Sequence, residues 1–392
     1  MSFTRNSLDT FLYSNNIKKF KNKIIKIKPY QTSKVIGYAA HTIPTIEPEA
    51  DTDTQTFILY FLDNEKCLLA HTFTGNLIHI VKKNLDSYHS EKQSIDADLF
   101  SYHGYIHPNI KINPYFILKN TSIPDTYTIQ HMHENVFLIP SHHMYGPNYL
   151  GTTVQHHKNQ QNMYWTLQAI KSIRLPLEPG FKSLDSCPQY TYSNDLLPTE
   201  TIPRLIGSTL IPAIMIQDHH VSDLKKITCS PYYSLEKYQY WKKIEYLSLA
   251  PGEKRKSFYT YGITPSTQQS LQYQLGLTLH QDGGFTFTDS GSRNDKSSLF
   301  FIKQQIMKDL HLHESSTKTT MESITKKYIH TNPFATEPYF HTKYILVTKL
   351  VLKRISQHDQ DPDIEMNHWI YTDPQTIQTT SKHILDTRGE SN

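Results

Sequence analysis

Histidine pairs and His-x-His triplets are the most frequent pattern in this sequence that could support chemistry. The chain holds 22 histidines, and the pattern recurs at five places: His131-Met132-His133, His142-His143, His156-His157, His219-His220 and His311-Leu312-His313. On a β-strand, the two rings of such a triplet lie on one face and can bind a metal ion if a third ligand joins them. With so many histidines, about one triplet is expected from composition alone, which favours a structural or surface role. Clustered histidines also gain charge as the pH falls from about 7 to 5, so pH sensing is an alternative.

Motifs of three enzyme classes occur in part, and none is complete. The His-Leu-His triplet at 311–313 resembles the metal-binding motif of HUH nicking endonucleases, with Tyr328 as a nucleophile, but the helicase motif G-x-x-x-x-G-K-[ST] is absent. The Asp-His pair at 218–219 has no G-x-S-x-G nucleophile elbow. The Tyr-Gly-Pro-Asn run at 145–148 resembles the calcium loop of secretory phospholipases, but the His-Asp-x-x-Tyr helix is missing. The sequence therefore predicts a protein that is not an enzyme.

Asp9 is the one carboxylate among the first 46 residues, which carry eight lysine or arginine residues. In the first turn of a helix, a carboxylate stabilises the free N–H groups and the N-terminal dipole, which is the plainer interpretation. If the segment bundles around a symmetry axis, Asp9 and Asn6 form a ring that binds a hard cation such as Ca²⁺. The acidic loops at 47–53 and 359–365 are predicted to be solvated, with weak Ca²⁺ binding at a subunit interface as the alternative. No cofactor is required.

The basic N-terminal segment is predicted to be an amphipathic helix from about Ser7 to Ile27. Its apolar residues recur at helical spacing, and Pro29 ends it. The lysines between them form either the solvated face of a docked helix or a surface that contacts nucleic acid or a membrane. These lysines are Lys18, Lys19, Lys21, Lys23, Lys26 and Lys28.

The chain from Val35 onward is predicted to be β-rich. Short apolar runs alternate with turn signals such as Asp63-Asn64 and Gly75-Asn76. The longest strand is expected at Thr342–Ile355, and helices are expected at Leu299–Leu310 and Met321–Tyr328. No strand–helix alternation occurs, so a parallel α/β fold is excluded. The other strands are expected at 55–62, 66–72, 76–81, 114–119, 135–139, 165–173, 205–217, 238–249, 257–261, 271–280 and 285–288.

Composition restricts the compartment and the class. The 392 residues have a net charge of +4 and no run of about 18 apolar residues, so no membrane-spanning helix is expected. The N-terminus lacks the apolar centre of a signal peptide. The three cysteines, Cys67, Cys187 and Cys229, are widely spaced, which predicts a reducing compartment without a disulfide framework or a thiolate zinc site.

Two stretches resemble the capsid proteins of small single-stranded DNA viruses. The first is Trp241 followed by a strand to Leu249, the turn Pro251-Gly252-Glu253, and a strand at 257–261. The second, a long strand to Ile355 and then His-Trp-Ile-Tyr at 368–371, is similar to the C-terminal strands of parvovirus capsids. Because the chain lacks a glycine-rich N-terminal linker and the phospholipase motif, it most resembles the short capsid proteins of crustacean densoviruses.

That resemblance implies an all-β fold, an antiparallel eight-stranded jelly roll with long surface loops, in residues 35–392, and a basic amphipathic helical arm in residues 1–34. It implies a viral capsid protein that self-assembles in sixty copies into a T=1 icosahedral shell around single-stranded DNA. The implied partners are further copies of itself, the genome, a host cell receptor and an endosomal membrane. The implied location is the virion, with assembly inside the host cell in the nucleus. The alternative from another class is an intracellular β-sandwich ligand-binding protein with a basic tail.

Overall fold

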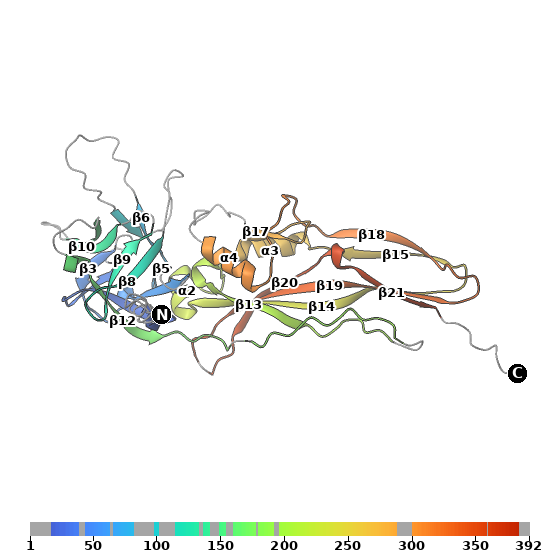
Figure 1. Cartoon of the computed structure of the whole chain (residues 1–392), viewed down its shortest axis with the longest axis horizontal. Helices are drawn as coiled ribbons and strands as arrows, with labels where there is room; N and C mark the ends of the chain where they lie inside the picture. The colour runs from blue at the N-terminus through green and yellow to red at the C-terminus, as the bar shows by residue number, and fades with distance from the viewer. Residues whose placement is uncertain are drawn as a thin grey trace, which may run out of the picture.

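The computed structural model describes residues 17–38, 44–62, 66–81, 98–101, 114–132, 136–141, 149–153, 160–177, 179–191, 196–287, 300–358 and 360–383. They form an elongated molecule in which two β-rich regions lie end to end (Figure 1). The N-terminal region ends with the strand at Trp165–Ser172, and the C-terminal region contains the longest strands. Within the described residues, no helix has both the length and the apolar character needed to cross a membrane.

The N-terminal region is built around a closed barrel. Six antiparallel strands pair in the order β12-β1-β4-β5-β8-β9, and β9 pairs back with β12 through Tyr127 and Trp165. Closure leaves no free edge in this ring of strands. The interior is apolar, with Ile25, Phe57 and Trp165 fully buried. The barrel strands are β1 (Lys23–Pro29), β4 (Phe57–Phe61), β5 (Lys66–His71), β8 (Tyr115–Asn120), β9 (Thr126–His131) and β12 (Trp165–Ser172).

Further short elements surround the barrel. Strands β10, β11, β3 and β2 continue the sheet beyond β9, and β6 pairs with β7. Their bounds are β2 (Lys34–Gly37), β3 (Thr45–Pro48), β6 (Ile78–Val81), β7 (Asp98–Ser101), β10 (Phe137–Ser141) and β11 (Tyr149–Thr153), with 3-10 helices η1 (Lys18–Phe20), η2 (Asp53–Gln55) and η3 (Gln160–Met163).

The C-terminal region is a long antiparallel sheet. Its strands pair in the order β13-β14-β19-β20, and β21 pairs with the first part of β19. The pairing of β14 with β19 extends from Tyr233 opposite Arg354 to Leu249 opposite Tyr339. The strands are β13 (Arg204–Pro212), β14 (Tyr232–Leu249), β19 (Tyr339–Arg354), β20 (Ile364–Thr372) and β21 (Gln378–His383).

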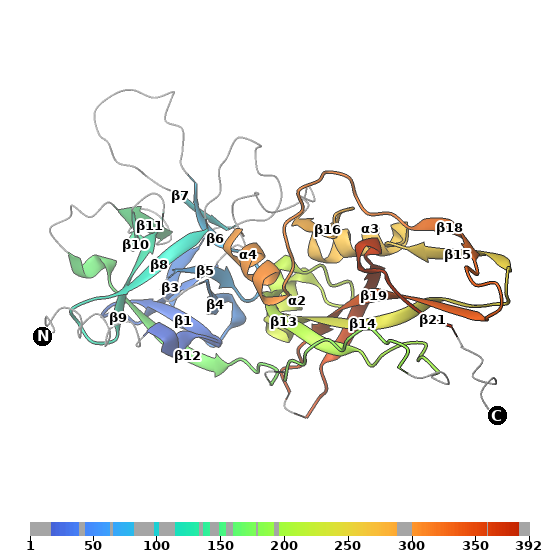
Figure 2. The ribbon, with the colours of Figure 1, turned by 45° about the vertical axis from the view of Figure 1, so that its right-hand side comes forward.

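Smaller elements cover this sheet. Strands β15 (Lys254–Tyr261) and β18 (Ile324–Thr331) form a two-stranded ribbon, and β16 (Leu277–Leu279) pairs with β17 (Phe285–Phe287). Figure 2 shows the ribbon beside the far end of the sheet, with helices α3 and α4 nearer the barrel. The remaining helices are α2 (Asp223–Cys229), α3 (Pro265–Leu275), α4 (Phe300–Asp309), η4 (Ala213–Met215) and η5 (Pro374–Thr376).

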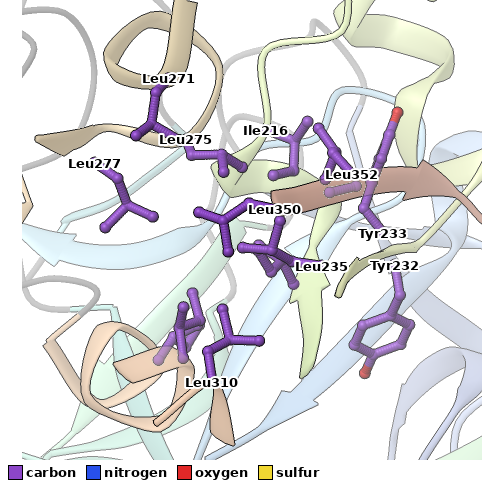
Figure 3. Close-up of a cluster of buried hydrophobic side chains, with 14 of the residues drawn as sticks. Ile216, Tyr232, Tyr233, Leu235, Leu271, Leu275, Leu277, Leu310, Leu350 and Leu352 are labelled. Carbon is purple, nitrogen blue, oxygen red and sulfur yellow. The ribbon is translucent and has the colours of Figure 1, made fainter. Parts of the chain in front are cut away.

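One hydrophobic core joins the two regions. Leu235, Leu350 and Leu352 of the long sheet pack with side chains of α3 and α4 (Figure 3). The same cluster includes Tyr60 and Tyr115 from the barrel. The Tyr60 hydroxyl donates a hydrogen bond of 3.0 Å to the Pro231 carbonyl across the junction. The barrel and the sheet are therefore packed against each other.

The prediction of a mostly β fold is confirmed, but no eight-stranded jelly roll is seen among the described residues. A six-stranded barrel and a separate long sheet occupy the range assigned to it. Most predicted strands are present, and α4 confirms the helix expected at Leu299–Leu310. Two predicted segments of the C-terminal region are wrong. The first half of the strand expected at 271–280 is the end of α3, which Thr264 caps through the Thr267 N–H, and the helix expected at Met321–Tyr328 is largely strand β18.

The predicted N-terminal helix is wrong from Lys23 onward, whereas Lys18–Phe20 forms a single 3-10 turn. Lys23–Pro29 is strand β1, paired with β12 on one side and β4 on the other. Ile25 and Ile27 are fully buried in the barrel. β-Branched side chains favour such a pleated, enclosed position over a helix. Part of the predicted arm is thus one of the six barrel strands.

Candidate functional site

The lysines predicted to contact nucleic acid or a membrane lie on the barrel. Lys26 donates a hydrogen bond of 2.8 Å to the Ala50 carbonyl, and the Lys28 ammonium lies 2.7 Å from the Glu49 carboxylate. The hydrogen bond from Lys28 lowers the pKa of Glu49. Lys19 forms an ion pair with Asp125. Lys19, Lys26 and Lys28 therefore bind carbonyl and carboxylate groups of their own N-terminal region.

The remaining predicted site residues are less constrained by the structure. Lys18 and Lys21 are exposed and Lys23 is half-buried. Asn6 and Asp9, with their predicted Ca²⁺ site, lie outside the described residues. That site, and contact of the lysines with a membrane or nucleic acid, stay predictions.

The histidine patterns singled out in the sequence do not assemble a site among the described residues. His219 stacks on Tyr273 with a ring-centroid distance of 4.9 Å, and His311 and His313 follow α4. The grouping of His, Cys, Asp and Glu that does come together in the described part of the chain is Glu245, His330 and His341. None of these three belongs to a His pair or triplet.

This cluster lies between the β15–β18 ribbon and the long sheet. Glu245 is on β14 and only 6% exposed, at a bulge where the register with β19 shifts. On β19, Lys343 lies opposite Glu245. His341 lies two residues before Lys343, on the same face of that strand. His330 reaches the cluster from the ribbon strand β18. Two layers of the fold thus contribute to one buried polar group.

The Glu245 carboxylate is the centre of the cluster. One oxygen, Oε1, lies 3.0 Å from His330 Nε2 and accepts a hydrogen bond from the Ser257 hydroxyl. The other, Oε2, lies 3.0 Å from Lys343 Nζ and 3.4 Å from His341 Nε2. Burial acts to raise the pKa of Glu245, but the close polar contacts with His341, Ser257 and Lys343 outweigh it and lower the pKa to about 2. The carboxylate is therefore ionised at any physiological pH.

Aromatic rings enclose the charged groups. Tyr259 and Tyr328 stack across the ribbon with centroids 4.8 Å apart, and the Lys343 ammonium lies 4.2 Å from the centre of the Tyr328 ring. The ring faces stabilise this cation. Burial raises the pKa of Tyr259 and lowers the pKa of His330. The hydroxyl of Tyr259 is thus neutral, and the His330 ring favours its neutral form.

The outer face of the ribbon differs from its inner face. Phe258 is 64% exposed and Ile329 is 63% exposed, whereas Tyr259 is buried. On this outer face the hydroxyls of Thr260 and Thr325 form a hydrogen bond, with their oxygens 2.7 Å apart. The alternation follows the pleat of a strand, in which successive side chains point to opposite faces.

The described residues between β12 and β13, namely 173–177, 179–191 and 196–203, run beside the sheet and belong to no named helix or strand (Figure 1). The Trp241 indole N–H donates a hydrogen bond of 2.9 Å to the Asp185 carbonyl, and the Tyr190 hydroxyl lies 2.7 Å from that of Thr342. The segment also presents apolar side chains to solvent, with Leu177 and Leu196 almost fully exposed. Phe181 and Ile202 of the same segment are also exposed, at 59% and 67%.

Comparison with known proteins gives a consistent result. A family model described as "Insecticidal Crystal Toxin, P42" matches residues 204–349, from β13 into β19, and so includes the ribbon and the Glu245 cluster. The insecticidal crystal protein Cry35Ab1 of Bacillus thuringiensis is 29% identical over 180 residues, which are 45% of this chain and 45% of that protein. The binary larvicide subunit BinA of Lysinibacillus sphaericus is 23% identical over 309 residues, 77% of this chain and 75% of BinA.

The fold is shared over almost the whole chain. The crystal structure of Cry35Ab1 superimposes with a TM-score of 0.72 and 21% sequence identity, covering 92% of this chain and 90% of that one. The chain is therefore a mostly β protein with the fold of Cry35Ab1.

These findings overturn the capsid interpretation. The resemblance to parvovirus and densovirus capsids, the sixty-copy shell, the DNA genome, the viral receptor and endosomal partners, and the virion or nuclear location are all wrong. Trp241 and the long strand to Ile355 are the β14–β19 pair of the elongated sheet, so the pattern reflected long paired strands in general. The alternative of an intracellular ligand-binding β-sandwich is not supported either.

Proposed function

We propose that this protein is an insecticidal toxin and acts as one subunit of a two-protein toxin. The observation that carries the proposal is the match of fold along the whole chain to Cry35Ab1, an insecticidal crystal protein. The second part draws on the relatives BinA and BinB, both of which are named as subunits of a binary larvicide.

The exposed apolar side chains at 173–203 support a role for a second protein. Leu177 is 94% exposed and Leu196 is 98% exposed on a segment that hydrogen bonds tether to the sheet. Apolar side chains held in this way lose little conformational freedom when a partner covers them. We assign this segment as a contact surface for the second subunit. That the chain is not an enzyme stays a prediction.

A feeding assay tests the proposal. The purified full-length chain is given to larvae of several insect orders, alone and together with the binary larvicide subunit BinB of Lysinibacillus sphaericus as the second protein, and mortality is counted. Larval death that increases when the second protein is added is the expected result, with heat-denatured protein at the same dose as the control. Equal survival with native and denatured protein, in every order and with both mixtures, contradicts an insecticidal function. Death that does not change when the second protein is added contradicts only the two-subunit part.

A further inference from the structure

We propose that Glu245, His330 and His341 bind a divalent transition-metal ion of the zinc class, which links the β15–β18 ribbon to the long sheet. The proposal is independent of the insecticidal function, because it rests on the geometry of three side chains, of which Glu245 and His341 are buried and His330 is half-buried. It assigns a ligand to a cluster that the comparisons with known proteins leave without one.

The spacing of the ligand atoms fits a single ion. The carboxylate and the two imidazole nitrogens all lie within 4.8 Å of one another. Glu245 Oε1 is 3.0 Å from His330 Nε2, and Glu245 Oε2 is 3.4 Å from His341 Nε2. A tetrahedral zinc ion with bonds of about 2.0 to 2.1 Å holds neighbouring ligand atoms about 3.3 Å apart. The three side chains therefore need small rotations to take an ion between them.

The same atoms lack well-aligned hydrogen bonds. Among the described residues, His330 Nε2, His341 Nε2 and Glu245 Oε2 are buried side-chain atoms without a hydrogen bond of good geometry. Buried nitrogens and oxygens in native proteins are almost always satisfied, and each exception calls for an explanation. That all three face one another indicates a shared ligand. A metal ion accepts a lone pair from each nitrogen and from the carboxylate, so it would satisfy all three together.

The chemistry of the donors selects the metal. Two imidazoles and one carboxylate form the ligand set of tetrahedral zinc sites that keep a fourth position open for water. Ca²⁺ and Mg²⁺ prefer six or more oxygen ligands or an octahedral shell of oxygens, which this set does not offer. The Tyr339 hydroxyl lies 3.5 Å from Nδ1 of His341, where it can orient the ring with Nε2 toward the ion.

Lys343 is the competing cation in this site. Its ammonium lies 3.0 Å from Glu245 Oε2, where a metal ion would repel it. The faces of Tyr328 and Tyr259, 4.2 and 5.2 Å away, offer the ammonium a place to move. Binding of the ion therefore exchanges one cation for another, and removing the Lys343 charge should strengthen metal binding.

The position of the ligands gives the ion a structural consequence. Glu245 and His341 belong to the sheet and His330 belongs to the ribbon. The core between these layers is otherwise small and consists mainly of Tyr240, Tyr259, Tyr261, Ile345 and Val347. An ion that binds the folded arrangement but not the unfolded chain raises the stability of that arrangement.

Two measurements on the full-length, EDTA-treated chain test the proposal: calorimetric titration with ZnCl₂, and thermal unfolding with and without ZnCl₂. Both are repeated with MgCl₂, because Mg²⁺ is a hard ion that this ligand set should not bind. The expected result is one Zn²⁺ per chain at this site, a rise in Tm with Zn²⁺, and no such rise with Mg²⁺. His330→Gln and His341→Gln should each weaken this binding more than about tenfold and abolish the Tm shift, and Lys343→Met should strengthen binding.

His219→Gln is the matched control, because His219 is an exposed histidine outside the cluster. It should bind zinc as the parent protein does, which separates the site from adventitious binding by surface histidines. If His330→Gln and His341→Gln retain the parent affinity and Tm shift, or if the parent binds no zinc, the proposal is wrong. His330 is only half-buried, so we expect His330→Gln to fold. It therefore tests the site even if a substitution of the buried Glu245, such as Glu245→Gln, prevents folding.

Discussion

The barrel and the ribbon–sheet interface are both β-structures, but they are held together in different ways. Inside the barrel, Ile25, Phe57 and Trp165 are fully excluded from water, and the ring of strands is closed. Beneath the ribbon, the buried groups include Glu245 and Lys343. Apolar burial is insensitive to pH and ions, whereas a buried charge is stable only while its partners keep their charge and position. The barrel strands also bury His71 and His131, but their core is mainly apolar, whereas the ribbon is held to the sheet by a buried cluster of charged groups.

The largest effect should come from breaking the barrel at Trp165. Its side chain is fully buried, and its indole N–H donates a hydrogen bond of 2.9 Å to the Leu138 carbonyl. Trp165→Ala should lower the free energy of unfolding by about 4 kcal/mol, because it leaves a large cavity and an unpaired carbonyl. Urea unfolding followed by far-UV circular dichroism measures this change. A loss below about 1 kcal/mol would show that the barrel does not depend on this contact.

Removing the charge at the centre of the ribbon interface should have the next largest effect. Glu245→Gln leaves the buried Lys343 ammonium without its carboxylate, so we expect a loss of about 3 kcal/mol. The ribbon should also become sensitive to limited proteolysis while the barrel stays protected. Glu365→Gln, at an exposed pair with His368, is the matched control and should unfold like the parent. Equal protease resistance of the ribbon in both variants would argue against a charge-dependent interface.

Lys237 offers a pH test of buried charge elsewhere on β14. Its side chain is 6% exposed and donates a hydrogen bond of 3.1 Å to the His311 carbonyl, and burial lowers its pKa to about 8. The pKa of Lys237 is lower in the folded protein than in the unfolded chain. Burial of the charged ammonium therefore lowers the free energy of unfolding below pH 8, and this loss disappears as the pH rises toward 10.5.

We compare the parent with Lys237→Met, which has no titrating group at this position. As the pH rises from 8 to 10, the free energy of unfolding of the parent should increase by about 2 kcal/mol more than that of Lys237→Met. The measurement is the difference in urea stability of the two proteins at each pH. A constant difference across this range would mean that the ammonium is not disfavoured by burial.

The smallest effect on stability is expected at the exposed segment. Leu177→Ser removes an apolar side chain that is 94% exposed, so the free energy of unfolding should stay within about 0.5 kcal/mol of the parent. If the segment contacts a second subunit, the variant should bind that subunit more weakly and kill fewer larvae with it. Unchanged binding would place the contact surface elsewhere.

Local patterns predicted the secondary structure better than the assembly. Strand β4 follows from a short continuous apolar run, and β19 and the helix α4 also follow from the residue pattern in one short window. Ile17, Phe20, Ile24 and Ile27 fit a helix equally well, and only pairing with distant β12 decides that the last two are in a strand. Propensity is a weak guide where tertiary pairing can override it.

The polar cluster could not be found by spacing. His330 lies 85 positions after Glu245, and His341 lies 11 positions later still, so no short motif contains the three residues. The β14–β19 register and the position of the ribbon bring them together. The His-x-His triplets are visible in the sequence because their residues are adjacent, but adjacency alone does not make a site. The capsid resemblance is wrong because it also rests on local patterns, and long paired strands occur in many β-proteins.

The junction between the barrel and the sheet limits which barrels and sheets from different proteins can be joined in one chain. Ile58, Tyr60 and Tyr115 of the barrel share one core with Tyr232 and Leu235 of the sheet. Either half expressed alone would expose that apolar surface to water. The two halves are therefore not interchangeable modules. A chimaera that takes its barrel from one protein of this fold and its sheet from another would fold only if both donors carry matching side chains at this seam.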